Sequence, residues 1–187
     1  MDIETLIDAV IAREGDYSDH PADRGGATCW GISEAVARAN GYRGEMRNYP
    51  RVEAEAIYRR LYWERPGFAR LAKFAPSVAQ ELFDSGVNLG PAAAISFLKR
   101  ALNAMNRNGA DYADVDAVPL IDDASLAALQ SFLAKRGPAG EAVLLKALDA
   151  LQGERYVHIA ETRPVNEAFL YGWFARRISH VQAANFS

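Results

Sequence analysis

Hydrophobic residues recur along this chain at the spacing of amphipathic helices. Between residues 2 and 14, apolar side chains occupy positions i, i+3, i+4, i+7 and i+8, with Asp2 as a candidate N-cap and Gly15 at the expected end. The same period predicts helices near residues 33–40, 52–64, 76–90, 91–106, 125–137, 140–163 and 166–181. The fold class that these patterns predict is mainly α.

The segment from Gly15 to Ile32 interrupts this pattern. It is rich in Gly, Asp, Ser and Pro and follows neither a helical nor a strand period, so it predicts a long ordered loop in which a short β-hairpin could form. Long loops inside compact domains are commonly functional. A second polar stretch near residue 110 is the best internal boundary by composition, although two lobes sharing one core fit equally well.

Composition and charge narrow the function classes. The chain has 187 residues, of which 50% are hydrophobic and 24% charged, as in soluble globular proteins. Its net charge of -3 provides no positive field for nonspecific nucleic-acid binding, and Arg176, Arg177 and His180 are interpreted as helix-end cations. Cys29 is the only cysteine, so the chain has no internal disulfide and no thiolate metal site. We interpret it as a packed thiol and expect no metal or organic cofactor.

Two acids in unlike surroundings lie near the start of the chain. Glu14 ends the first helix beside Ile11 and Tyr17, where the helix dipole disfavours its ionised form, whereas Asp23 lies in a Gly-rich loop that favours ionisation. Such a pair suits hydrolysis of a glycosidic bond, which needs a protonated acid on one side of the sugar and a polar group on the other. Thr28 follows Asp23 by five positions, and its hydroxyl could orient the attacking water.

Residues 13–33, REGDYSDHPADRGGATCWGIS, resemble glycoside hydrolase family 108, the bacterial and phage N-acetylmuramidases. The family's pattern is close to EGGY, then NDPADPGGATN, then an aromatic residue and GIT. The sequence departs from it at Asp16, His20, Arg24 and Cys29, and Asp16 would add a negative neighbour to Glu14. The resemblance implies a lysozyme-like helical fold with a long Gly-rich active-site loop and Glu14 as the catalytic glutamate.

The resemblance continues through AIYRRLYWERPGF and AQELFDSGVNLGP, the latter matching a family helix that carries Asp84 and Asn88 one turn apart. These two side chains either line the floor of a substrate cleft or satisfy buried polar groups, and the two interpretations are equally supported. From about residue 94 the chain is similar to a predicted peptidoglycan-binding module. The resemblance thus implies a catalytic region at residues 1–93 and a helical C-terminal lobe at residues 94–187 packed against it.

Several aromatic residues are candidates for stacking on sugar rings. Tyr17 and Trp30 flank the two acids and are preferred for this role, whereas Trp63 ends a periodic apolar face, as a core residue would. The C-terminal stripe also has helical spacing, which favours a core position over a carbohydrate platform. It consists of Phe169, Tyr171, Trp173 and Phe174.

The leading hypothesis is a peptidoglycan hydrolase of the lysozyme or endolysin kind. It would cleave the β-1,4 bond between N-acetylmuramic acid and N-acetylglucosamine, with Glu14 as general acid, Asp23 as base or electrostatic stabiliser, and Thr28 positioning water. By analogy, the order of these residues favours inversion. A lytic transglycosylase and a non-catalytic wall-binding accessory to secretion are the alternatives.

The sequence also leads to an expectation about where such an enzyme acts. The first residues, MDIETLIDAVIAREG, have no basic segment, no uninterrupted apolar core and no cleavage site of a Sec signal. No apolar run approaches the roughly 20 residues of a spanning helix. We therefore expect synthesis in the cytoplasm and action on peptidoglycan in the periplasm or wall, after passage through a holin pore or a dedicated export apparatus.

Overall fold

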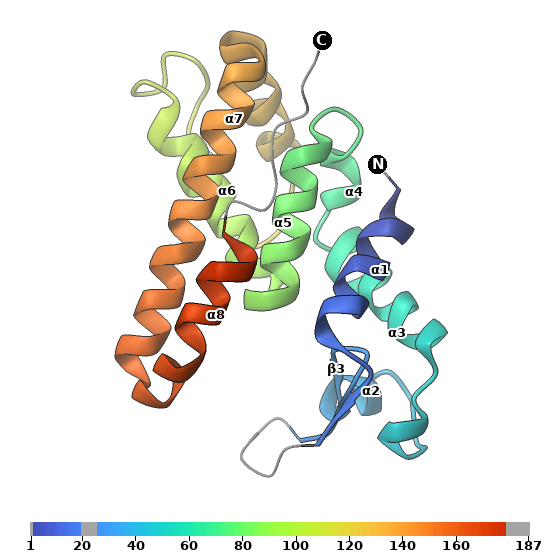
Figure 1. Ribbon diagram of the computed structural model, residues 1–187. Helices are drawn as coiled ribbons and strands as arrows, with labels where there is room; N and C mark the ends of the chain where they lie inside the picture. The colour runs from blue at the N-terminus through green and yellow to red at the C-terminus, as the bar shows by residue number, and fades with distance from the viewer. Residues whose placement is uncertain (1, 20–25, 179–187) are drawn as a thin grey trace. The chain divides into compact units, whose positions relative to one another are not determined.

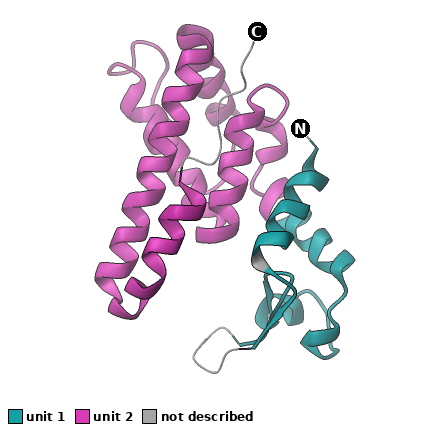
Figure 2. Ribbon diagram, viewed as in Figure 1, with its two compact units in different colours: residues 1–61 teal, residues 62–187 magenta. Residues whose placement is uncertain are grey.

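The computed structural model describes residues 2–19 and 26–178, apart from the side chain of Glu14. The described chain is mostly helical, which confirms the mainly α, lysozyme-like expectation (Figure 1). It forms two compact units, residues 1–61 and residues 62–187 (Figure 2). This division falls inside a helix and does not test the boundary near residue 93, which stays a prediction.

The first unit begins with α1 (Ile3–Glu14), whose apolar stripe is its buried face. The side chain of Asp2 accepts a hydrogen bond from the Glu4 N–H, 3.3 Å away, and so caps the helix as expected. The Gly15 N–H donates to the Ile11 carbonyl over 3.1 Å, closing the last turn. The stripe consists of Leu6, Ile7, Val10 and Ile11, each at most 8% exposed.

A three-stranded antiparallel sheet follows, in the order β1 (Tyr17–Ser18), β2 (Thr28–Cys29) and β3 (Ile32–Ser33). Trp30 and Gly31 connect β2 to β3 with φ of 54° and 75°, the positive pair that a two-residue type I′ turn requires. The sequence allows a short β-hairpin in this segment, and the structure contains one.

Four more helical segments complete the first unit and lead into the second. They are α2 (Glu34–Ala39), η1 (Met46–Asn48), α3 (Arg51–Ile57) and η2 (Tyr58–Glu64). Ser33 caps α2 by accepting from the Val36 N–H over 3.4 Å, as predicted. The sequence indicates one regular helix over residues 52–64, whereas η2 has π geometry, a difference that hydrophobic spacing does not reveal.

The second unit is a helical bundle with α5 (Pro76–Leu89) near its centre. The other elements are α4 (Phe68–Leu71), α6 (Pro91–Met105), α7 (Asp123–Thr162), η3 (Pro164–Asn166) and α8 (Glu167–Arg177). Helix α5 packs against α4, α6 and α7 (Figure 1). Leu82 and Phe83 are each 1% exposed, but Glu81 and Asp84 on the same helix are equally buried, at 1% and 2%. The centre of this unit therefore contains carboxyl groups as well as apolar side chains.

Helix α7 bends sharply in its first half. At Gly137 the backbone takes φ 61° and ψ -160°, and Pro138 follows, so one helical segment ends and another begins. The sequence predicts helices at residues 125–137 and 140–163, and this break confirms their separation. The start of α7 is fixed by Asp122, whose carboxylate accepts from the Ser125 N–H over 2.9 Å.

Helix α8 corrects the interpretation of the C-terminal aromatic stripe. Phe169, Tyr171 and Phe174 are 57%, 87% and 40% exposed, so the expectation of a core stripe is wrong for them. The Trp173 ring lies 5.2 Å from that of Tyr156 in α7. Helix α8 packs on α7 and η3, which cover only part of its aromatic face, and the hydrophobic period could not reveal this.

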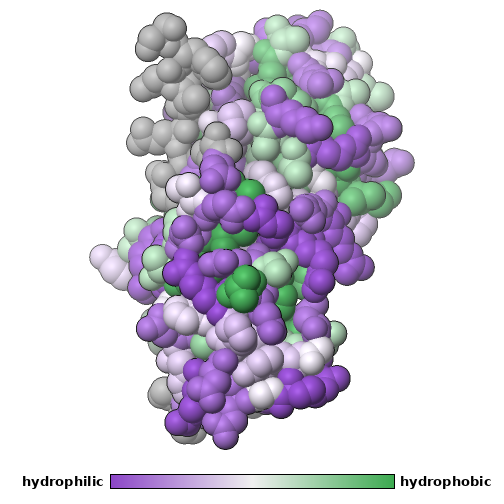
Figure 3. All heavy atoms as spheres, turned by 90° about the vertical axis from the view of Figure 1, so that its right-hand side faces the viewer, coloured by the Kyte–Doolittle hydropathy of each residue, from purple (hydrophilic) through white to green (hydrophobic). Residues whose placement is uncertain are grey.

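Within residues 2–19 and 26–178, no helix is both long and apolar enough to cross a bilayer. Hydrophilic residues cover most of the face drawn in Figure 3, with apolar side chains showing in smaller groups between them.

Candidate active site

Glu14 is the last residue of α1, where the chain turns towards the sheet. Gly15 makes the turn with φ 80°, and β1 begins at Tyr17, three residues after Glu14. The backbone of Glu14 therefore lies at the negative end of the helix dipole, where an ionised carboxyl is disfavoured. The Glu14 side chain and the whole of Asp23 lie outside the described residues, so their catalytic roles stay predictions.

The sheet places Thr28 in a row of hydroxyl side chains. Thr28 pairs with Ser18 on one side and with Ser33 on the other, so the three residues share one face of the sheet. The opposite face carries Tyr17, Cys29 and Ile32, and the last two are buried. Thr28, which is half-buried, thus faces away from the side of the sheet that packs into the core.

Trp30 holds the tip of the hairpin through three hydrogen bonds. Its indole N–H donates to the Tyr49 carbonyl over 2.9 Å, and its own carbonyl accepts from the Tyr58 hydroxyl over 3.0 Å. Its backbone N–H donates to the Asp16 carbonyl over 2.7 Å. These contacts explain how a non-glycine residue is kept at positive φ and give Trp30 a structural role. Its predicted stacking on sugar remains untested.

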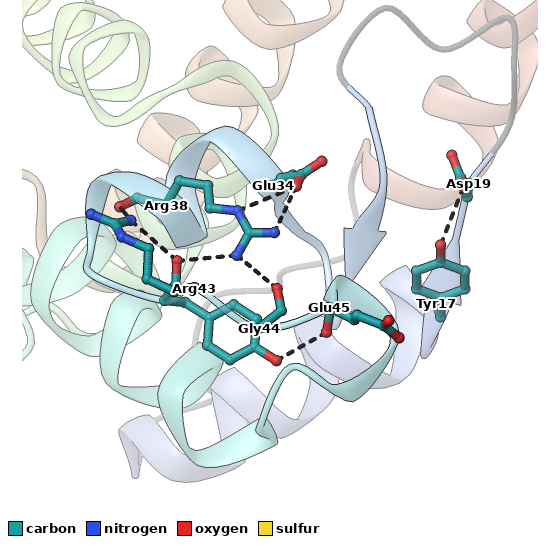
Figure 4. Close-up of polar contacts among 8 residues, drawn as sticks. Tyr17, Asp19, Glu34, Arg38, Arg43, Gly44 and Glu45 are labelled. Carbon is teal, nitrogen blue, oxygen red and sulfur yellow. Dashed lines mark hydrogen bonds and ion pairs between the residues drawn. The ribbon is translucent and has the colours of Figure 1, made fainter.

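A hollow of about 500 Å³ lies in the first unit beside β1, α2 and η1. Figure 4 shows part of its polar lining. The residues around it are Tyr17, Asp19, Ala27, Glu34, Arg38, Glu45, Met46 and Arg47. Three carboxylates and two guanidinium groups therefore surround a space of the size that binds small ligands.

Arg38 fixes one wall of this hollow. Its Nη2 and Nε donate to Glu34 Oε1 over 2.8 and 3.2 Å, and its Nη1 donates to the Gly44 carbonyl over 2.7 Å (Figure 4). The guanidinium thus ties α2 to the loop that leads into η1. Glu34 and Arg38 form an ion pair that holds this wall in place.

Tyr17 forms another part of the lining. Its hydroxyl donates to Asp19 Oδ2 over 3.3 Å, and the Arg47 guanidinium lies 5.7 Å from the centre of its ring. The side chain is 40% exposed, which leaves aromatic surface open to a ligand. Of the two aromatic residues that the sequence favours for stacking, Tyr17 is the one beside the hollow.

The sequence did not single out Glu34, Arg38 or Asp19 as site residues. Glu34 follows the helix cap Ser33 and resembles an ordinary acid of a first helical turn, and Arg38 resembles its i+4 salt-bridge partner. Their common position beside Tyr17 depends on the path of the chain between α2 and η1, which no local pattern specifies.

Asp84 and Asn88 lie on α5, in the second unit. The Asp84 side chain is 3% exposed, and its Oδ2 lies 3.7 Å from Nη1 of Arg177, whose side chain is 13% exposed. Arg177 is therefore more than a helix-end cation, because it forms a buried ion pair between α8 and α5. This geometry favours the structural interpretation of Asp84; Asn88 is half-buried, and its predicted substrate contact is untested.

Glu81, on α5, is a buried acid with a strongly raised pKa. Burial, followed by the negative charges of Asp149 and Asp84, raises its pKa from 4.5 to about 8, although a hydrogen bond from Ser85 opposes this. It is a buried group of the second unit, enclosed among helices. We assign it no part in the reaction, and its raised pKa makes the stability of the second unit depend on pH.

Two further sequence interpretations concern Cys29 and Trp63, and both are confirmed. Cys29 is 3% exposed, and burial raises the pKa of its thiol, as expected of a packed cysteine. Trp63 is buried in an edge-to-face contact with Phe83, with ring centres 5.8 Å apart. Within the described residues, no group of three or more His, Cys, Asp and Glu side chains is arranged to hold a metal ion.

Family models match almost the whole chain in two consecutive segments. Residues 7–90 match Glycosyl hydrolase 108, and residues 93–178 match the Predicted Peptidoglycan domain. The first of these segments belongs to glycosyl hydrolase family 108. This family 108 segment contains α1 from Ile7 onward, the sheet and the hollow, together with α5 of the second unit. The resemblance inferred from residues 13–33 and from the C-terminal half is therefore confirmed.

The solved structure of SagA from Brucella abortus is similar to this chain. The TM-score is 0.68 and the sequence identity 24%, over 94% of this chain and 90% of the SagA chain, which shows a common fold. The search among curated proteins gave no significant match. Together, the glycosyl hydrolase and peptidoglycan segments support the function of a glycosidase that degrades peptidoglycan in the cell wall.

Proposed function

We propose that this family 108 protein is an N-acetylmuramidase. It hydrolyses the β-1,4 bond between N-acetylmuramic acid and N-acetylglucosamine, with Glu14 as the general acid. The observation that carries the proposal is the position of Glu14, which lies in the family 108 segment at the end of α1. Tyr17, which lines the hollow of the first unit, follows Glu14 by three residues.

The chemistry requires Glu14 to keep its proton until the glycosidic oxygen departs. The negative end of the helix dipole supports this, and the negative charge of the nearby Asp16 would act in the same direction. Asp23 acts as base or electrostatic stabiliser on the opposite face of the sugar, and Thr28 positions the water. In the inverting mechanism that we favour, the two carboxyl groups stand about 6.5–9.5 Å apart.

The hollow of the first unit supplies groups that can hold a sugar. Tyr17 offers an aromatic face, and Asp19 and Glu45 offer carboxylate oxygens that can accept hydrogen bonds from hydroxyl or amide groups. Glu34 and Arg38 form a fixed ion pair that keeps this wall in place. We propose that Tyr17 makes the principal stacking contact and that Trp30 mainly supports the hairpin.

The Glu14→Gln variant tests the proposal. Loss of turbidity of purified sacculi should stop in this variant while its circular dichroism and melting temperature stay unchanged, because only the proton donor is removed. Glu53→Gln is a matched control, since Glu53 is an exposed glutamate of the same unit, and it should lyse sacculi at the wild-type rate. Lysis by Glu14→Gln at the wild-type rate would refute the proposed mechanism.

Analysis of the released muropeptides distinguishes the nearest alternatives. Reducing N-acetylmuramic acid ends are expected, and their initial anomeric configuration reports inversion or retention. Ends closed as 1,6-anhydro rings would identify a lytic transglycosylase instead. If wild-type protein binds sacculi but releases no fragments, the chain is a non-catalytic wall-binding protein.

We also propose that the enzyme acts in the periplasm or wall after passage through a holin pore or a dedicated export route. Cells expressing the wild-type chain should lyse only when such a route is supplied. Lysis that needs neither a pore nor an export system would contradict this part of the proposal.

A further inference from the structure

A second hollow, of about 550 Å³, lies in the second unit between the end of α6 and the bend of α7. Its walls are mainly apolar and include Met105, Phe132 and Val143, and two arginines, Arg107 and Arg136, also line it. Val143 is 52% exposed, so part of this apolar lining is open to solvent. The volume lies in the range of small-ligand pockets.

Positive charge exceeds negative charge at the rim. Arg107 Nε donates to Asp111 Oδ2 over 2.9 Å, Lys135 Nζ lies 3.2 Å from Oδ1, and Arg136 Nη2 lies 4.0 Å from Oδ2. The hydrogen bond from Arg107 and the contact with Lys135 lower the pKa of Asp111 to about 2, so it is ionised at neutral pH. Three cations face this one carboxylate, and none of the residues described as lining the hollow is acidic.

Irregular backbone shapes both walls. Arg107 and Asn108 each take φ 56°, a left-handed conformation that costs a non-glycine residue stability, and the Asn106 side chain supports this turn by accepting from the Gly109 N–H over 3.1 Å. On the other side, the bend at Gly137 ends the first segment of α7 just after Arg136. An arginine therefore stands at each of these two irregular points of the backbone, and on the Arg107 side the backbone is strained, as is common at binding sites.

We propose that this hollow binds the stem peptide of peptidoglycan, with the terminal D-alanyl carboxylate on Arg136 and Arg107 and the alanyl methyl groups against Met105 and Val143. The inference rests on the proposed peptidoglycan substrate. It places the ligand within the segment that matches the Predicted Peptidoglycan domain. An apolar floor with a cationic rim fits a carboxylate that follows small apolar side chains, whereas a neutral glycan would leave the surplus charge unused.

The test uses the full chain carrying Glu14→Gln, so that the ligand is not cleaved during binding. The probe is a fluorescent stem pentapeptide ending in D-Ala-D-Ala, compared by anisotropy with the same peptide bearing a C-terminal amide. The free acid should bind at least about tenfold more tightly, since a charged hydrogen bond is lost with the amide. Binding of the free acid should also weaken with added salt.

Two variants with matched controls locate the site. Arg136→Gln removes the guanidinium that is least engaged with Asp111, and Val143→Asp adds a carboxylate at the exposed apolar rim. Each should weaken peptide binding at least about tenfold. The controls are Arg155→Gln and Val157→Asp, which change exposed residues of the same helix, with Val157 about 21 Å from Val143 along the axis. Both controls should bind as the parent does.

Three results would overturn the inference. The first is an Arg136→Gln variant that binds the peptide as tightly as the parent does. This variant is expected to fold, because the Arg136 side chain is 46% exposed. Another is equal binding to intact sacculi and to glycan strands freed of peptide by an amidase. The third is displacement of the protein from sacculi by poly(glycerol phosphate) but not by the stem peptide, which would identify a phosphate polymer as the ligand.

The outcome is independent of the catalytic proposal. Suppose that the Glu14→Gln chain binds the peptide, that Arg136→Gln weakens this binding, and that the wild-type chain releases no muropeptides. These results would support the peptide site and refute the muramidase proposal. Conversely, active muramidase whose Arg136→Gln variant binds the free peptide unchanged would refute the site alone.

Discussion

The substitution Glu81→Gln should stabilise the second unit at alkaline pH and leave its stability almost unchanged in acid. Glu81 is 1% exposed on α5, with Asp84 on the same helix and Asp149 on α7 contributing negative charge. Of these acids, Asp84 is paired with a cation, Arg177. The amide of glutamine keeps an oxygen that can accept from Ser85 but cannot ionise.

The magnitude follows from the raised pKa. Between the ordinary value of 4.5 and the folded value of about 8, the folded protein holds a proton that the unfolded chain has released. Unfolding free energy therefore falls as pH rises through this interval, by roughly 1.4 kcal/mol per pH unit. The wild-type protein should lose on the order of 5 kcal/mol between pH 4.5 and pH 8 from this group, and Glu81→Gln should lose none of it.

Urea denaturation at pH 5 and pH 8, followed by circular dichroism, measures this difference. The midpoint of Glu81→Gln should exceed that of the wild type at pH 8 and approach it at pH 5. Glu154→Gln, an exposed glutamate on α7, is the control and should follow the wild type at both pH values. If the urea midpoints of Glu81→Gln and the wild type changed equally with pH, Glu81 would not be held protonated by its surroundings.

Four further substitutions test other parts of the structure by the same denaturation assay. Asp84→Asn should destabilise the protein by about 3 kcal/mol, because the buried Arg177 loses the carboxylate of Asp84, and adding Arg177→Gln should partly restore the loss. Trp30→Phe should cost about 1 kcal/mol through loss of the bond to the Tyr49 carbonyl, yet retain sacculus lysis. Gly137→Ala should cost about 1–3 kcal/mol, since φ 61° with ψ -160° is accessible essentially to glycine alone; an unchanged midpoint would refute the strain.

Local patterns predicted most helix positions correctly. The start of α1 at Asp2, the cap of α2 at Ser33 and the break after Arg136 each depend on a few neighbouring residues, which the sequence displays directly. The exposed stripe on α8 was misinterpreted because a helical period identifies a common face but not the partner that covers it. The buried pair of Asp84 and Arg177 was missed for a related reason, since its members are 93 positions apart.

The candidate site was predictable only in part. The motif of residues 13–33 led to the family, which the match of residues 7–90 confirms, whereas the catalytic role of Glu14 stays a prediction. The hollow beside Tyr17 depends on the loop between α2 and η1, where Arg38 binds backbone carbonyls of Tyr42 and Gly44. Every residue has a backbone carbonyl that can accept such a hydrogen bond, so the residue types in the loop do not predict these contacts.

The pH dependence of lysis will combine two acids that act in the same direction. A general acid at position 14 loses activity as pH rises through its pKa, and burial of Glu81 makes the folded state less stable over the interval up to about pH 8. A decline measured with the wild-type chain therefore cannot be assigned to Glu14 alone. In the Glu81→Gln background the stability contribution is removed, so a decline of the initial lysis rate that persists there is the decline expected from the proposed general acid Glu14. If the lysis rate of the Glu81→Gln variant did not change with pH, the pH dependence of the wild type would come from folding of the second unit. Glu14 would then not be an acid that titrates over that range.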